Sequence, residues 1–159
     1  MCSARPIMVP SRGATRVHEM RLQRLAVLYA PVLGAGVWLS LRLGVGAHPG
    51  GDPVRALAFK GTGLAPPLFL PAALFAAAVL SPRRDALGTV ATATAGVVGL
   101  AFTAGTTLNL RNDISAARDA DSPAGLTIVI AAFHWLFGPA LAVSAFQGLR
   151  ERSRNSEPK

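Results

Sequence analysis

One histidine stands in the middle of a long apolar segment and is the residue best placed to do chemistry. His134 lies in the stretch Ser122–Leu149, which contains no Asp, Glu, Lys or Arg. An ionisable group inside an apolar span is a candidate haem ligand, proton relay or quinone contact. The alternative is a neutral histidine that bonds a threonine hydroxyl or a carbonyl freed near Pro139. Bis-histidine haem would need a second histidine opposite, and His18 and His48 lie outside the apolar stretches.

A second candidate is a group of polar residues that we expect at one face of the molecule, the outer face. Its members are Arg42, Asp52, Asn109, Arg111 and Asp113. Such side chains could hold an anionic headgroup or a divalent cation, although the spacing of a calcium-binding EF-hand loop is absent. The alternative is a solvated loop with helix-capping residues. No nucleophile elbow, phosphate-binding loop or paired cysteines occur, so we expect no metal and no cofactor.

The distribution of the charges indicates a membrane protein. Of 159 residues, 16 are basic and 8 are acidic. All of them lie outside four stretches, Leu25–Leu41, Gly61–Pro82, Ala86–Leu110 and Ser122–Leu149. A helix crosses the hydrocarbon core, about 30 Å thick, with about 20 residues, whereas a soluble helix of that length needs a polar face. The sequence therefore predicts an all-α fold, an integral membrane four-helix bundle in which sequential neighbours are antiparallel.

The expected spans lie at about 22–44, 64–81, 86–109 and 124–147, within one membrane domain of residues 22–149. The link Ser81–Asp85 is short enough to force a helical hairpin, and Asp85 can cap the helix that follows. Pro71 is expected to kink the second span, because proline removes a backbone donor.

The basic residues also predict an orientation in the cell membrane. With four spans, both chain ends and the link between the second and third spans lie on the same side of the membrane. That side carries 11 Lys and Arg residues, and the other side carries 5. Because basic residues concentrate at the cytoplasmic face, we expect both termini inside, against anionic lipid headgroups. The net charge of +8 could suggest nucleic-acid binding. The charges are spread over short flanks without a binding motif, so we expect no nucleic-acid partner.

The two ends of the chain differ from the membrane domain in composition. Residues 1–21 carry arginines and two prolines, Pro6 and Pro10, and are expected to form a disordered basic cytoplasmic arm. Met20 stands directly before the first span, which leaves open whether translation begins at Met1 or at Met20. Residues 150–159 are expected to form a short charged cytoplasmic tail.

Small residues recur at helical spacing and predict a helix-packing seam. Its members are Gly36, Ser40 and Gly44 in the first span, Thr89, Thr92, Gly96, Gly99, Thr103 and Thr106 in the third, and Ala131, His134 and Gly138 in the fourth. Small side chains let helix backbones approach closely in lipid. We expect the third and fourth spans to pack along these stripes, which would bring His134 inside the bundle with Thr103 as a hydrogen-bond partner.

These features favour a small multi-pass membrane protein that acts through helix packing, as an accessory or scaffold subunit of a membrane-protein partner or of a homo-oligomer. One alternative is a membrane enzyme or redox component that uses His134 on a lipid-soluble substrate. Another is a small-molecule carrier, for which the threonine stripe would supply the only polar path. The four apolar stretches lack the intramembrane carboxylate that a proton-coupled carrier commonly uses, which weighs against that class of protein. A non-enzymatic role is favoured over an enzymatic one.

Overall fold

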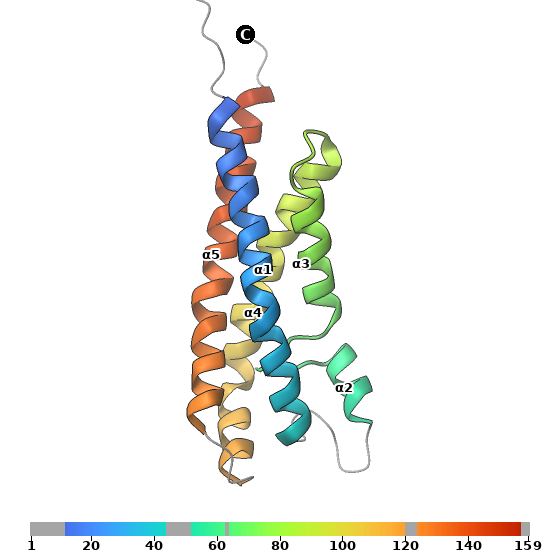
Figure 1. Ribbon diagram of the computed structural model, residues 1–159, viewed down its shortest axis with the longest axis vertical. Coiled ribbons are helices and arrows are strands. Elements are labelled where there is room, and N and C mark those ends of the chain that lie inside the picture. The colour runs from blue at the N-terminus through green and yellow to red at the C-terminus, as the bar shows by residue number, and fades with distance from the viewer. Residues whose placement is uncertain (1–11, 44–51, 63, 120–123, 157–159) are drawn as a thin grey trace, which may run out of the picture.

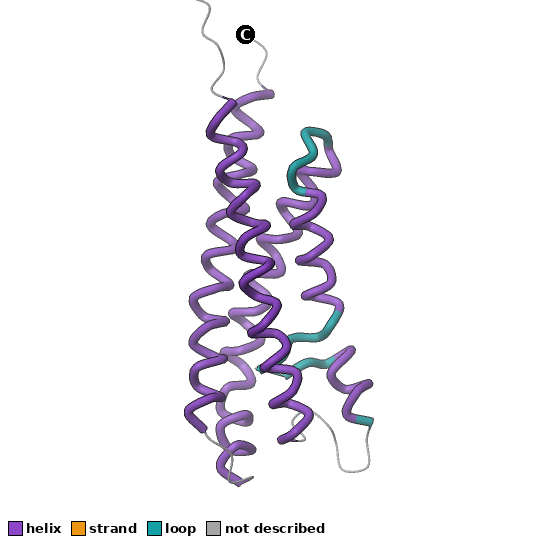
Figure 2. Tube along the Cα trace, in the orientation of Figure 1, coloured by secondary structure: helices purple, strands orange, loops and turns teal. Residues whose placement is uncertain are grey.

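The computed structural model describes residues 12–43, 52–62, 64–119 and 124–156, and every regular element in these ranges is a helix (Figure 2). In chain order the helices are α1 (Arg12–Leu43), α2 (Pro53–Phe59), α3 (Phe69–Leu80), α4 (Ala86–Asp119) and α5 (Ala124–Ser156). Helices α1, α4 and α5 are long and apolar enough to cross a membrane. Helix α3 has 12 residues, fewer than the about 20 that a straight crossing needs.

The long helices lie side by side, and α3 flanks them (Figure 1). Helix α4 packs along α5 and against α3, while α1 packs on α5 and α3. The beginning of α1, the turn between α3 and α4 and the end of α5 all lie at one end of the molecule, called here the α3–α4 end (Figure 1). Helix α2 lies toward the opposite end, called here the α2 end.

Two prolines explain why α3 is shorter than the expected span of 64–81. Pro66 and Pro67 follow one another, and a residue that precedes proline is driven out of the helical conformation. The helix therefore begins at Phe69, after both prolines. The expected kink at Pro71 is also wrong. Since α3 begins at Phe69, Pro71 falls in its first turn, where no helical donor is lost.

The other helices extend beyond the expected spans. Helix α1 begins at Arg12, so residues 12–21 are helical and do not belong to a disordered arm, and no proline interrupts the chain between Pro10 and Pro31. Helix α4 continues ten residues past 109, and α5 includes the first seven residues of the expected tail. These extensions contain no proline. Gly44, residues 1–11 and residues 157–159 lie outside the described residues.

The helices expose many large apolar side chains, and their interior contains polar residues beside apolar ones. Leu108 and Leu136 are 80% and 77% exposed. Other exposed apolar side chains are Val27, Leu28, Trp38, Val79, Val90, Val97, Leu100, Val129, Val143 and Phe146. The buried residues include Ser40, Thr92, Thr106, Thr127 and His134. A surface of this kind is suited to lipid and not to water.

Glycines allow the backbones of α4 and α5 to touch. A methyl group added at Gly99 would lie 2.5 Å from the carbonyl oxygen of Gly138, and one added at Gly138 would lie 2.5 Å from the carbonyl oxygen of Gly99. Gly96 faces Ala145 at 3.1 Å by the same measure. No larger residue fits at the Gly99–Gly138 contact, which therefore sets the distance between the two helices.

We predict that Gly138→Ala lowers the free energy of unfolding by about 1–3 kcal/mol, the usual cost of overpacking. The measurement is unfolding in detergent followed by circular dichroism. Gly105→Ala is the matched control, because a methyl group there meets no atom within 4 Å. The control should leave stability unchanged or raise it through helix propensity. Equal destabilisation by the two substitutions would contradict a tight contact at Gly138.

Candidate functional site

A hydrogen bond between Tyr29 and His134 joins α1 to α5 inside the molecule. The Tyr29 hydroxyl lies 3.1 Å from His134 Nε2, and His134 Nδ1 lies 2.9 Å from the carbonyl oxygen of Ile130. A carbonyl can only accept, so Nδ1 carries the proton and Nε2 accepts from the tyrosine hydroxyl. Both residues are fully buried. A neutral imidazole therefore has both ring nitrogens engaged within the chain.

Aromatic rings from α4 and α5 surround this pair. Tyr29 stacks on both Phe102 of α4 and Phe137 of α5, with ring centroids 4.9 Å away in each case. The imidazole of His134 meets the rings of Tyr29, Phe102 and Phe133 edge to face. Offset stacking and edge-to-face contacts are the favoured geometries for such rings. The pair is thus enclosed by apolar surface on the sides that these rings cover.

The expected hydrogen bond between His134 and Thr103 is wrong. The Thr103 hydroxyl donates to the carbonyl oxygen of Gly99, four residues before it, at 3.2 Å. Thr92 does the same with Gly88 at 2.8 Å. A threonine in a helix satisfies its hydroxyl locally in this way, which leaves His134 to find its partner on α1. The carbonyl that His134 uses is that of Ile130, and not one freed by Pro139.

The threonines of the expected seam lie at different depths. Thr92 and Thr106 are buried, and Thr89 is exposed in the first turn of α4, where its hydroxyl donates to the Asp85 carbonyl at 3.3 Å. On α5, Gly138 and Ala131 are buried together with His134. Thr92 meets Gly148, and Gly99 meets Leu141. Because Thr92 and Thr106 are sealed inside the protein, the stripe offers no continuous polar path.

Gly36 and Ser40 of α1 receive a loop and not another helix. A methyl group at Gly36 would overlap the carbonyl oxygen of Leu64, and the hydroxyls of Ser40 and Thr62 are hydrogen-bonded at 2.9 Å. The side chain of Leu64 packs with Leu39 of α1 and Ile130 of α5. The chain that precedes α3 therefore fills space next to α1 and α5 that a longer helix would have occupied.

Thr62 provides the hydrogen bonds of this loop. Its hydroxyl oxygen accepts the backbone N–H groups of Leu64 at 3.1 Å and Ala65 at 2.9 Å, and its own N–H donates to the Ala65 carbonyl at 2.6 Å. We call the residues Thr62, Leu64 and Ala65 the Thr62 turn. All three are buried, so side-chain and backbone partners replace the bonds that a helix would supply.

The residues of the expected outer-face cluster have separate surroundings. The Arg42 guanidinium lies 5.2 Å from the centre of the Trp38 ring, Asp52 accepts the N–H of Val54 at 2.9 Å, and the Asn109 amide donates to the Gly105 carbonyl at 2.9 Å. Arg111 is exposed on α4. Asp113 is buried at 1% exposure. The segment from Asn109 to Asp113 is helical and not a loop.

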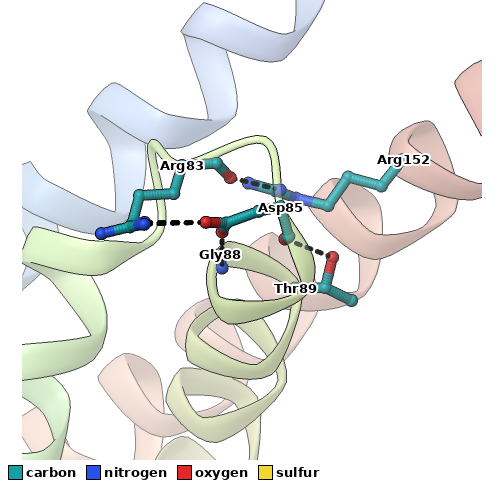
Figure 3. Close-up of polar contacts among 5 residues, drawn as sticks. All are labelled: Arg83, Asp85, Gly88, Thr89 and Arg152. Carbon is teal, nitrogen blue, oxygen red and sulfur yellow. Dashed lines mark hydrogen bonds and ion pairs between the residues drawn. The ribbon is translucent and has the colours of Figure 1, made fainter.

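The turn between α3 and α4 is tied to α5 by an arginine that sequence reasoning did not single out (Figure 3). Arg152 donates to the carbonyl oxygens of Ser81 and Arg83, and the contact to Arg83 measures 2.7 Å. Within the turn, Asp85 accepts from the Arg83 guanidinium at 2.9 Å and from the N–H of Gly88 at 3.0 Å. The prediction that Asp85 caps this helix is confirmed.

The same contacts alter the ionisation of Asp85. The hydrogen bond from Arg83 and then that from the Gly88 N–H lower the pKa of the Asp85 carboxyl from its ordinary value of 3.8. Both contacts stabilise the ionised form of the group. Gly88 cannot be replaced here, since a methyl group would overlap the Arg83 carbonyl oxygen.

The sequence contains a signal for Tyr29, although Tyr29 was not among the candidate residues predicted from it. It is the only tyrosine of the chain and lies inside a charge-free stretch. A hydroxyl in apolar surroundings needs a hydrogen-bond partner, and His134 is the ionisable side chain of another such stretch. Among the described residues, no group of three or more His, Cys, Asp or Glu could hold a metal ion.

We predict that Tyr29→Phe lowers the free energy of unfolding by about 1 kcal/mol, the scale of a hydrogen bond between buried helices. The loss has a physical cause, because Nε2 of His134 is left without its donor. A double-mutant cycle with His134→Leu measures the coupling by detergent unfolding. Trp135→Phe is the control, since it removes a bond to Thr107 at the surface. A coupling of zero between Tyr29 and His134 would refute the pairing.

The lowered pKa of Asp85 predicts an acid-sensitive contribution to stability. The contribution is complete above the ordinary carboxyl value of 3.8 and is lost as the pH falls through the lower value of the folded chain. Asp85→Asn keeps an oxygen for the Gly88 N–H but has no charge to lose. Unfolding by denaturant from roughly pH 6 to pH 2 should bring the two proteins together at low pH. A difference that does not change with pH would reject the ionic role.

Comparison with family models, with curated proteins and with solved structures finds no significant match to this chain. The contacts of the described residues are therefore the basis for a functional proposal.

Proposed function

We propose that this chain is a four-pass integral membrane protein that serves as an accessory or scaffold subunit. Three long apolar helices support the membrane assignment, and α3 with the Thr62 turn would make the fourth crossing. The 12 residues of α3 cover about 18 Å at 1.5 Å per residue. The remainder of the hydrocarbon core, about 30 Å thick, is left to the loop that leads into α3. Loop backbone is tolerated at that depth because it is buried in protein.

The orientation in the proposed membrane follows from the charges. The α3–α4 end carries the arginines of the α3–α4 turn and of the end of α5. We propose that the protein lies in the cell membrane with this end in the cytoplasm. The support is the excess of basic residues, 11 against 5 over the whole sequence. Both chain ends would then be cytoplasmic.

The observation that carries the scaffold role is that the interior is already occupied by the chain itself. Both nitrogens of His134 are bonded, Thr92 and Thr106 are sealed within the protein, and Gly96, Gly99 and Gly138 are covered by α4–α5 packing. The surface therefore remains for interaction. On α1, Ala30 and Gly34 are exposed four residues apart, and no atom lies within 4 Å of a methyl group added at Gly34.

The alternative functions receive less support from this geometry. A redox or proton-transfer role for His134 needs access for a lipid-soluble substrate, and the imidazole is buried at 1% exposure beneath aromatic rings. A carrier needs a path, and the threonine stripe does not supply one. The scaffold role requires neither access nor a path.

We predict that Gly34→Leu reduces association with a neighbouring subunit about tenfold or more, as expected when a well-packed contact is lost. The assay is chemical cross-linking in intact membranes, with cross-linked species counted on denaturing gels. Folding should be unchanged, because the added side chain meets open space at Gly34. Gly36→Leu is the comparison, since it collides with Leu64 and should lower thermal stability instead.

Two outcomes would contradict the proposal at different levels. Equal yields of the same cross-linked species from Gly34→Leu and the unaltered chain would exclude this face of α1 as the contact. Recovery of the unaltered chain in the supernatant after alkaline extraction and high-speed centrifugation would exclude the membrane assignment itself.

A further inference from the structure

Exposed arginines lie together at the α3–α4 end of the molecule. They come from two parts of the chain that are distant in sequence, the turn before α4 and the end of α5. The side chains are Arg83, Arg84, Arg150 and Arg154, and all four are exposed. We call this set the arginine ring.

The arginine ring lies at the level where the helices leave their charge-free stretches. Arg84 and Arg150 are each next to, or within two residues of, the end of such a stretch. Arg154 lies one helical turn beyond Arg150, about 6 Å along the axis at 1.5 Å per residue. The headgroup layer on each side of the hydrocarbon core is about 5–7 Å thick. In the proposed membrane, the ring would therefore coincide with the layer of lipid phosphates.

Among the side chains that the structure describes, few acidic groups neutralise this end. Asp85 is the partner of Arg83, and Glu151 is half-buried and already engaged. No ion pair of Arg84, Arg150 or Arg154 occurs among the described residues. Arg150 and Arg154 are separated by one helical turn, and two like charges at this spacing repel each other. An anion bound beside them would remove that repulsion.

The contacts of Arg152 keep the parts of the ring together. Arg152 lies between Arg150 and Arg154 in sequence but bonds to the turn, through the carbonyls of Ser81 and Arg83. Figure 3 shows the bond to Arg83. The last two turns of α5 are thereby fixed beside the α3–α4 turn. Arg84 and the α5 arginines consequently stay at a common level and do not move independently.

The α2 end is a weaker candidate for the same role. Arg42 lies over the Trp38 ring, and Arg55, Lys60, Arg111 and Arg118 are exposed. Asp52 and Asp119 are also exposed at this end. Acidic groups are therefore interspersed with the basic groups here.

We propose that the arginine ring binds the phosphate groups of anionic phospholipids, in preference to zwitterionic ones. This inference rests on the proposed membrane topology. A lipid is favoured over a soluble partner because the ring borders the apolar surface, so that one molecule can place acyl chains on exposed side chains such as Val90 and Phe146 and its phosphate on an arginine. Arginine forms paired hydrogen bonds with phosphate.

The test measures lipid binding to the purified full-length protein in detergent by native mass spectrometry. The probes are a phosphatidylglycerol and a phosphatidylcholine with identical acyl chains. Each basic residue near an anionic surface contributes about fivefold in affinity. The triple variant Arg84→Gln, Arg150→Gln, Arg154→Gln should therefore bind phosphatidylglycerol about tenfold or more weakly, with phosphatidylcholine binding unchanged. These side chains are exposed, and an unchanged circular dichroism spectrum verifies the fold.

A matched variant removes the same number of charges from the α2 end: Arg55→Gln, Lys60→Gln, Arg111→Gln. It should weaken phosphatidylglycerol binding by about threefold or less, because exposed carboxylates lie at that end beside the basic groups. Equal losses in the two triple variants would overturn the assignment to the α3–α4 end. Equal affinity of the unaltered protein for the two lipids would overturn the proposal, as would displacement of phosphatidylglycerol by an equal concentration of inorganic phosphate.

Membrane extraction of the same variants separates this inference from the proposed function. A chain that stays in the membrane but does not distinguish the two lipids contradicts the arginine ring alone. A chain that is released into the aqueous phase contradicts the membrane topology, and the ring with it.

Discussion

The contact between Gly99 and Gly138 determines how the other parts of the molecule can meet. With no side chain between the backbones of α4 and α5, the two helices pack at the shortest distance available to them. The large rings next to these glycines, Phe102 and Phe137, have no space in the seam and stack on Tyr29 of α1. The position of α1, and with it the bond to His134, therefore depends on an approach that only glycine permits.

Hydrogen bonding within the chain explains which polar residues are tolerated in the interior. Threonines of α4 bond to carbonyls of their own helix, and Ser40 bonds to Thr62. His134 is satisfied by Tyr29 and by its own helix. In apolar surroundings an unpaired group would be costly, and these bonds remove that cost. The bonds of His134 account for the presence of a buried histidine between α1 and α5.

Much of the architecture follows from local patterns, and the exceptions have physical causes. The charge-free stretches predict the three long helices, and Asp85 predicts the start of α4, because both signals are local. Pro66 and Pro67 carried a signal for the shortened α3, but the length of the apolar stretch concealed it. The bond between Tyr29 and His134 could not be derived in the same way. It depends on the rotation of α1 against α5, which tertiary packing sets.

The short α3 and the Thr62 turn have a consequence for biogenesis. The Thr62 turn lies directly against Gly36 and is hydrogen-bonded to α1 through the hydroxyls of Ser40 and Thr62. In the proposed membrane, this loop backbone would be exposed to lipid without α1 beside it. The insertion machinery would then have to keep α1 nearby until α3 arrives, because early release of α1 into the bilayer would separate two parts that complete each other.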